Sequence, residues 1–301
     1  MKRRIAAFLI CSVILLSGCT KAKNEKSEQE FTTGITYSNL VDKASQEEVK
    51  AALGKAGIAP DRIETFLSNV DLFNETVENK TLNEGFMKID NLLPEYDVES
   101  MQDMWDSKHP EFLGYNCRIT SYDLMGEFVE VKNPTFDDVS QLFADKLTID
   151  THPTLFTDDE EKQFMSLYSH IKTVASTDIQ THLDKVKENW KQKGVTFKNE
   201  DKASLIFVFF NFDDGTNDPT VFVGHIGVLL KMDDGKLLFV EKLAFQEPYQ
   251  AIKFNNRTEL NDYLMNRYDV EWNQPTSSPF IMENGELLEG YRENPNKNKG
   301  E

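Results

Sequence analysis

The chain has 301 residues, 39% of them hydrophobic, and its 51 acidic side chains outnumber 33 basic ones, for a formal net charge of -18. That much apolar material, including 21 phenylalanines, is enough for the core of one large domain or two small ones. The acidic balance excludes nucleic-acid binding, because no cluster of basic residues after residue 4 could neutralise a row of phosphates.

The amino-terminus has the features of a secretion signal. Residues 2–4 are basic, and the apolar run over residues 5–16 is too short to span a bilayer but has the length of a signal-peptide core. The run ends in Leu16-Ser17-Gly18-Cys19, the pattern of a bacterial lipobox. The sequence therefore predicts a lipoprotein signal peptide over residues 1–18 and a diacylglyceryl group on Cys19. The alternative is an amino-terminal core helix.

Cleavage before Cys19 would remove three basic residues and leave a mature chain of net charge -21. Residues 19–35 are mostly polar or charged, so we expect a lipidated flexible tether. No other run reaches the roughly 20 apolar residues of a spanning helix, and an acidic domain gains nothing from an anionic membrane surface. We therefore expect the lipid to hold the protein on the outer face of the cell membrane.

Residues 36–291 are predicted to form a single α+β domain that is helical in its first half. Apolar residues at helical spacing predict helices over residues 60–73, over 158–174 behind a capping box, and from Ser176 to Gly194. The period then changes to that of strands. An antiparallel sheet of about four strands is predicted, followed by a helix over residues 258–268. The expected strands cover residues 204–212, 221–230, 237–245 and 251–254, and residues 292–301 are expected to be a disordered tail.

Cys117 is the one thiol of the mature chain besides Cys19, so no intramolecular disulfide framework is expected. A turn at Gly114 followed by a helix-compatible stretch would place Cys117 at the start of a helix. There the helix dipole and free backbone N–H groups favour the thiolate over the thiol. The alternative is that Cys117 is a small buried hydrophobic side chain, as most free cysteines are. The local sequence favours neither.

His225 lies between Gly224 and Gly227 in an apolar strand. Because glycine weakens strands, the pair predicts that another group, such as a substrate, approaches the backbone closely. The alternative is a core histidine with one hydrogen bond. Glu241, in the next strand, is either a partner of His225 or an edge-strand charge. A three-residue hairpin loop over 233–235 would put Glu241 on the face of His225, whereas a two-residue loop would put it on the opposite face.

Together these three residues would make a thiol triad. His225 would take the proton of Cys117, Cys117 would attack a carbonyl carbon, and Glu241 would hold the imidazole. The backbone N–H of Cys117 would stabilise the oxyanion. Three further polar residues are candidates for support, the first two at the oxyanion and the third as a reserve orienter: Asn116, Tyr115 and Gln246. The histidines form no pair at metal-ligand spacing, so no metal and no cofactor are expected.

Together with the lipobox, three stretches resemble a known family: Tyr115-Asn116-Cys117-Arg118, Gly224-His225-Ile226-Gly227-Val228 and the run from Glu241 to Tyr249. They are similar to the domain-of-unknown-function family 4300, whose members are bacterial, mostly Gram-positive, lipoproteins. That resemblance implies an extracytoplasmic location but no activity. At longer range, the order of cysteine, histidine and polar residue resembles the papain-like superfamily, including cell-wall peptidases of the NlpC type.

The papain-like resemblance implies a papain-like layout with Cys117 as nucleophile, His225 as base and Glu241 as orienter. The papain pattern has a glutamine six residues before the cysteine, where this chain has Glu111, which cannot donate a hydrogen bond when ionised. A surface-anchored thiol hydrolase or acyltransferase acting on an amide or ester of the cell envelope or outside the cell is the leading hypothesis. The alternatives are a non-catalytic lipoprotein that binds a solute or a protein partner, and a degenerate enzyme kept as a binding module.

Overall fold

The computed structural model describes residues 35–78, 81–89, 91–136, 138–198, 201–213, 215, 218–271 and 276–297. The expected signal peptide over 1–18 and all but the last residue of the expected tether lie outside these residues. The described part is a mixed α+β structure, as the sequence predicts. Within it, no helix combines the length and the apolar character needed to cross a membrane.

The centre of the fold is an antiparallel sheet with nine strands in the described part, so the expectation of about four strands is wrong. Four strands match the expected runs: β6 (Ala203–Phe212), β7 (Thr220–Lys231), β8 (Leu237–Lys242) and β9 (Tyr249–Phe254). The other five have two to four residues each, too few to show an alternating pattern in sequence: β1 (Thr36–Ser38), β2 (Met87–Lys88), β4 (Ile171–Lys172), β10 (Phe280–Glu283) and β11 (Glu286–Leu287). The order is β11-β10-β6-β7-β8-β9-β1-β2, with β4 paired to β7.

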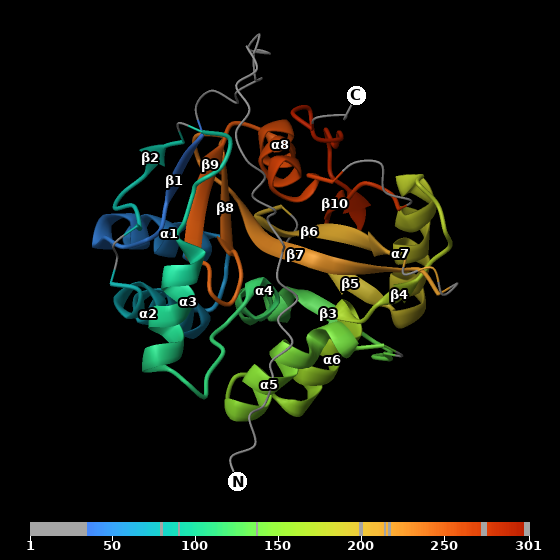
Figure 1. Ribbon diagram of the computed structural model, residues 1–301, viewed down its shortest axis with the longest axis horizontal. Coiled ribbons are helices and arrows are strands. Elements are labelled where there is room, and N and C mark those ends of the chain that lie inside the picture. Colours follow the sequence, from blue (N-terminus) through green and yellow to red (C-terminus); the bar gives the residue numbers. More distant parts are fainter. Residues whose placement is uncertain are drawn as a thin grey trace, which may run out of the picture.

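The helices are distributed unequally over the two faces of this sheet (Figure 1). Apolar side chains from α1 to α7 pack into one core with one face of the sheet, and α8 covers the other face. The helices are α1 (Lys43–Lys55), α2 (Pro60–Thr76), α3 (Val98–Lys108), α4 (Cys117–Met125), α5 (Phe143–Thr151), α6 (Asp158–Tyr168), α7 (Ile179–Lys193) and α8 (Arg257–Tyr268). A separate two-stranded sheet joins β3 (Val129–Val131) to β5 (Val195–Phe197).

The helix boundaries follow local signals, with one correction. The capping box at Thr157 is present at the start of α6, and Gly194 ends α7 at φ 66°, in the left-handed region that favours glycine. However, α6 ends at Tyr168, six residues before the expected end. Ile171, which continues the apolar spacing of that helix, pairs instead with Val221 of β7 in the short strand β4. Tertiary pairing therefore overrides the helical period there.

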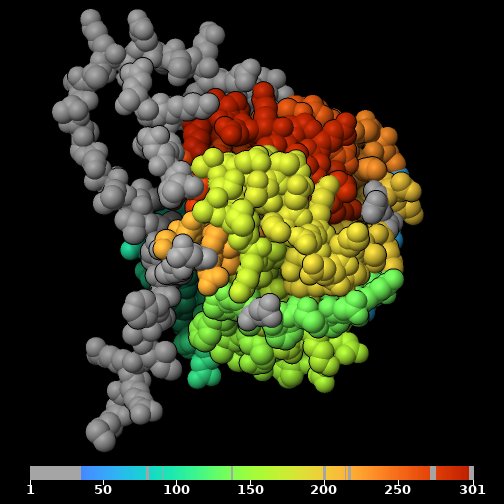
Figure 2. All heavy atoms as spheres, turned by 90° about the vertical axis from the view of Figure 1, so that its right-hand side faces the viewer, coloured from blue at the N-terminus to red at the C-terminus, as the bar shows by residue number. Residues whose placement is uncertain are grey.

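Part of the expected disordered tail is folded against α8. Arg292 forms an ion pair with Asp262, and both Asn294 and Lys297 bond to Asp269. The last turn of the described chain thus uses its polar side chains to satisfy carboxylates that the rest of the fold buries. In Figure 2 this carboxy-terminal segment is coloured red, at the top of the face that α7 presents. Residues 298–301 lie outside the described residues.

Candidate functional site

The site lies where strands β7 and β8 separate. Their hairpin has the three-residue loop over 233–235, with Gly235 at φ 83° and its N–H bonded to the Met232 oxygen. The β7–β8 ladder then ends at Val228 opposite Val240. His225 and Glu241 lie just beyond this last pair, and both point to the face that α8 covers. The hairpin register that the sequence left open is thus the one that brings these two side chains together.

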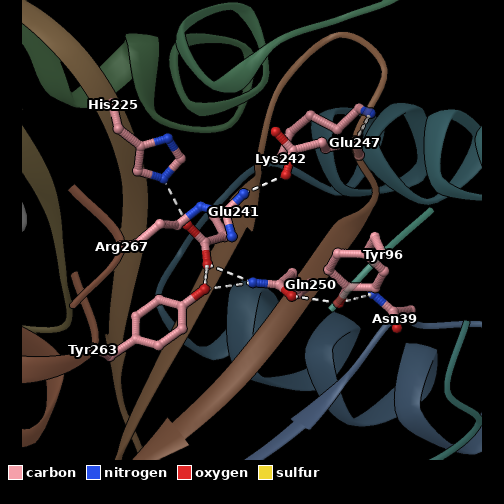
Figure 3. A network of polar contacts seen from close by, with 9 residues as sticks. All are labelled: Asn39, Tyr96, His225, Glu241, Lys242, Glu247, Gln250, Tyr263 and Arg267. Atoms are coloured by element: carbon pink, nitrogen blue, oxygen red, sulfur yellow. Dashed lines mark hydrogen bonds and ion pairs between the residues drawn. The ribbon is translucent and has the colours of Figure 1, made fainter. Parts of the chain in front are cut away.

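Glu241 is the centre of a buried polar network (Figure 3). Its Oε2 lies 2.6 Å from Nε2 of His225, and its Oε1 accepts hydrogen bonds from the Tyr263 hydroxyl and from Nε2 of Gln250, both at 2.8 Å. Gln250 in turn accepts a hydrogen bond from the Tyr96 hydroxyl at 2.6 Å. Because a carboxylate only accepts, Nε2 of His225 carries a proton, and Nδ1 is left to face another partner.

That partner is Cys117. It is the first residue of α4, which packs against β7 and β8 from the face opposite α8, so the thiol reaches His225 where the two strands part. The thiol is close enough to His225 for each side chain to shift the pKa of the other. Asn116 is the N-cap of α4, and its Oδ1 accepts the Ile119 N–H at 2.9 Å. The helix start expected at Cys117 is therefore present, with a side-chain cap that fixes its first turn.

The side chains of Cys117, His225 and Glu241 shift one another's pKa values. Burial by itself would raise the pKa of the Cys117 thiol, but the interaction with His225 and its positive charge holds that pKa below its usual value. Burial would likewise lower the pKa of His225, but its bonds to Cys117 and Glu241 and their negative charges raise it to about 9. Both shifts favour a thiolate beside an imidazolium over the neutral pair, and the thiolate is the reactive form of a cysteine nucleophile.

The expected supporting residues are engaged elsewhere. Asn116 donates its Nδ2 to Asp145 at 2.8 Å, so its amide is used by the cap and by this carboxylate. Asp145 also receives a two-pronged ion pair from Arg118, at 2.9 and 2.7 Å, which locks the first turn of α4 to α5. The ring of Tyr115 packs on Phe112 at 5.2 Å. The first turn of α4 is thus held by its cap and by this ion pair.

Gln246, the expected reserve for the orienting role, lies in the turn between β8 and β9, half-exposed. The glutamine that binds Glu241 is Gln250, which stands directly opposite Glu241 in the β8–β9 ladder. Tyr263 reaches the same carboxylate from α8. Neither residue was identified from the sequence, although the strand register would have revealed Gln250 had the true end of β8 been known.

The two glycines beside His225 make room for aromatic rings rather than for a ligand. A Cβ at Gly224 would lie 2.4 Å from the ring of Phe210, and one at Gly227 would lie 2.3 Å from the ring of Phe239. The inference from the sequence that something approaches the backbone closely is right, but the approaching groups belong to the core. The glycines are therefore part of the packing that lets His225 sit in this strand.

The site is closed. Cys117, His225 and Glu241 are 5%, 1% and 0% exposed, so the thiol does not lie in an open cleft. The ring of Tyr268 stacks on the imidazole of His225 with the ring centroids 5.0 Å apart. Lys242, the residue after Glu241, donates hydrogen bonds to the backbone oxygens of Phe245 and Glu247 in the β8–β9 turn.

The same turn is also tied to α8. Arg267, next to Tyr268, forms an ion pair with Glu247 of the turn. The described residues contain no group of three or more histidine, cysteine, aspartate or glutamate side chains that could hold a metal ion.

Comparisons with known proteins give one match. A family model described as "Domain of unknown function (DUF4300)" matches residues 36–288, which is most of the chain. No curated protein and no solved structure matches it. The papain-like resemblance is thus an expectation from the sequence alone, and the chemistry of the site has to be argued from its geometry.

Proposed function

Since the chain belongs to the family of the domain of unknown function DUF4300, a description that names no activity, we propose a function from the site itself. The protein is a cysteine hydrolase or acyltransferase that acts on an amide or an ester. The observation that carries this proposal is the arrangement of three side chains in the core: the thiol of Cys117, at a helix start, interacts with the imidazole of His225, and the carboxylate of Glu241 lies 2.6 Å from Nε2 of that ring.

In the proposed reaction the thiolate of Cys117 attacks the carbonyl carbon of the substrate. The oxyanion that forms lies toward the N–H groups at the start of α4, which lack acceptors within the helix. His225 gives its Nδ1 proton to the leaving amine or alcohol, so the carbon–nitrogen or carbon–oxygen bond breaks and an acyl-enzyme remains. The now neutral His225 takes a proton from water, or from an acceptor alcohol or amine, which attacks the acyl group and frees the thiolate.

Glu241 acts on the imidazole only. Its carboxylate fixes the proton on Nε2, which leaves Nδ1 aimed at Cys117, and it stabilises the imidazolium. Tyr263 and Gln250 hold the carboxylate in place, so the orientation of the ring is set by two strands and a helix. Substrate entry then requires a movement of the parts that cover the thiol, either the ring of Tyr268 or the β8–β9 turn.

The proposed location is the outer face of the cell membrane of a Gram-positive bacterium, with the lipid on Cys19 as anchor. The support is the lipobox sequence and the basic and apolar segments before it. A substrate in the cell envelope or outside the cell would follow from this location. Cys19→Ser should abolish metabolic labelling with palmitate and release the protein from the membrane fraction. Unchanged labelling would overturn the anchor and leave the site chemistry untouched.

The function is tested on the full-length chain in detergent, with limiting iodoacetamide between pH 5 and pH 9. Alkylation is measured at the Cys117 peptide by mass spectrometry, so that Cys11 and Cys19 do not interfere. We expect fast alkylation well below the ordinary thiol pKa of about 8.5. His225→Ala should abolish it. His182→Ala, which removes another fully buried histidine, is the matched control and should keep it.

An inert Cys117, or one whose alkylation follows ordinary thiol ionisation and ignores His225, would overturn the enzyme. It would instead favour the lipoprotein that binds a solute or a protein partner.

A further inference from the structure

A hollow of about 380 Å³ lies at the end of α8, on the face of the sheet that this helix covers. Pockets for small ligands have volumes of about 300–1,000 Å³ and mostly apolar walls with a few polar groups. This hollow has that character. Its walls are largely aromatic and apolar, and they come from β6, β7, the end of α8 and the segment before β10: Phe210, Phe212, Phe222, Tyr268, Val270 and Pro279.

The charged groups in its lining are mostly engaged elsewhere. Arg267 is paired with Glu247 of the β8–β9 turn, and Asp269 is paired with Lys297 at 2.5 Å. Glu271 lies exposed. A charged ligand would have to compete with these pairs for its counter-charge. The hollow therefore suits a neutral group.

One polar atom in the lining lacks a partner within the described part of the chain. Ser277 is 2% exposed, and its buried Oγ has no hydrogen bond there. An unsatisfied buried hydroxyl costs about 1–3 kcal/mol, so such groups normally have an acceptor or donor within reach. A ligand oxygen in the hollow would supply one.

The hollow adjoins the proposed catalytic residues through a single aromatic ring. Tyr268 lines the hollow, and the same ring stacks on His225 with an interplanar angle of 28°. Tyr268 is half-buried, whereas Tyr263 of the same helix is enclosed by the core. A turn of this ring away from His225 would join the hollow to the space beside the imidazole.

We propose that this hollow binds the acyl part of the substrate of the hydrolase, a neutral group with an aromatic ring and an oxygen that bonds to Ser277, with Tyr268 as the movable wall beside His225. This substrate class rests on the proposed function. The hollow itself can be tested without it, because binding of a neutral aromatic amide needs no reactive thiol.

Phenylacetamide is the first compound to test, with its binding to the full-length protein followed by ligand-observed NMR. Val270→Trp should fill the hollow from its exposed rim, where a larger side chain does not disturb folding. We expect this substitution to weaken binding by about tenfold or more, which corresponds to 1.4 kcal/mol. Val174→Trp is the matched control, since Val174 is exposed to a similar extent, 50% against 54%, and lies elsewhere. Absent binding, or equal binding by both variants, would overturn the proposal.

A second measurement tests whether a group bound in the hollow is presented to the thiol of Cys117. The alkylation rate of Cys117 is compared for iodoacetamide and for its aromatic analogue 2-iodo-N-phenylacetamide. We expect the aromatic reagent to react faster at Cys117, and Val270→Trp to remove that preference while Val174→Trp keeps it. Fast, His225-dependent alkylation without any aromatic preference would overturn the acyl pocket and leave the enzyme standing. A Cys117 inert to both reagents would overturn the enzyme, whatever phenylacetamide does.

Discussion

Replacing the carboxylate of Glu241 by an amide should weaken the charged forms of both His225 and Cys117. Glu241→Gln keeps the size of the side chain but loses the negative charge that lies 2.6 Å from Nε2 of His225. A buried hydrogen bond to a charged group contributes about 1.5–3 kcal/mol, and one pKa unit corresponds to about 1.4 kcal/mol. We therefore expect the pKa of His225, raised to about 9 in the wild type, to fall by about one to two units. The pKa of Cys117 should rise as the imidazolium is lost.

The assay is the iodoacetamide alkylation rate of Cys117 as a function of pH. At pH 6 the variant should react about tenfold to a hundredfold more slowly than the wild type, and the difference should shrink above the ordinary thiol pKa of about 8.5. Glu283→Gln is the matched control, because Glu283 is also a paired carboxylate but lies in β10, separated from β8 by β6 and β7. A pH profile unchanged in Glu241→Gln, or an equal loss in Glu283→Gln, would refute the reasoning.

Three further predictions concern stability. Gly227→Ala should lower the free energy of unfolding by about 1–3 kcal/mol, because its Cβ would meet the Phe239 ring. Gly285→Ala, which meets nothing closer than 3.9 Å, should change it little, and equal urea midpoints for the two would contradict this. Asp145→Ala should cost about 3–5 kcal/mol by leaving the Arg118 guanidinium without its counter-charge. The exposed Asp150→Ala should cost under about 1 kcal/mol, and similar urea midpoints for both would count against the buried pair. Finally, the His225 pKa, raised from 6.5 to about 9, adds stability that is fully present below pH 6.5 and is lost as pH rises toward 9. The lowered Cys117 pKa acts in the opposite sense, because its contribution is present above the ordinary thiol pKa of about 8.5 and is lost as pH falls, so the stability of the wild type should decline less steeply with pH than the His225 contribution alone would make it. Cys117→Ala removes the second contribution, and its stability should decline as pH rises; a parallel course for both proteins would be evidence against the pair.

The parts of the site that follow local rules could be predicted. A turn at Gly114 before a helix-compatible run places Cys117 at the helix start, where the structure adds Asn116 as the cap. The loop with Gly235 limits the hairpin to two registers, and the three-residue one found in the structure puts Glu241 on the face of His225. Both inferences need only a few consecutive residues. For the same reason the capping box and the terminal glycine of neighbouring helices were found at their true positions.

The partners of Glu241 could not be predicted, because they depend on contacts between distant segments. The β-rich run over 237–245 gives no sign that the strand ends at Lys242, so the pairing of Glu241 with Gln250 is hidden. Tyr263 reaches the carboxylate only because α8 packs on the face of the sheet to which Glu241 points, and this packing is set by tertiary contacts. The same holds for the short outer strands, whose pairing is set by the long strands beside them.

The depth of the network argues for chemistry rather than for stability. Buried ion pairs can often be replaced by apolar side chains of similar volume with no loss of stability, so a core that only has to hold together does not need them. Here a thiol, an imidazole and a carboxylate lie almost fully buried among aromatic and aliphatic side chains that could have filled the same space. A water-excluded setting strengthens each electrostatic contact and fits a thiolate that attacks only what is admitted. The proposed function then depends on the groups that cover the site, among which Tyr268 both stacks on His225 and lines the aromatic hollow.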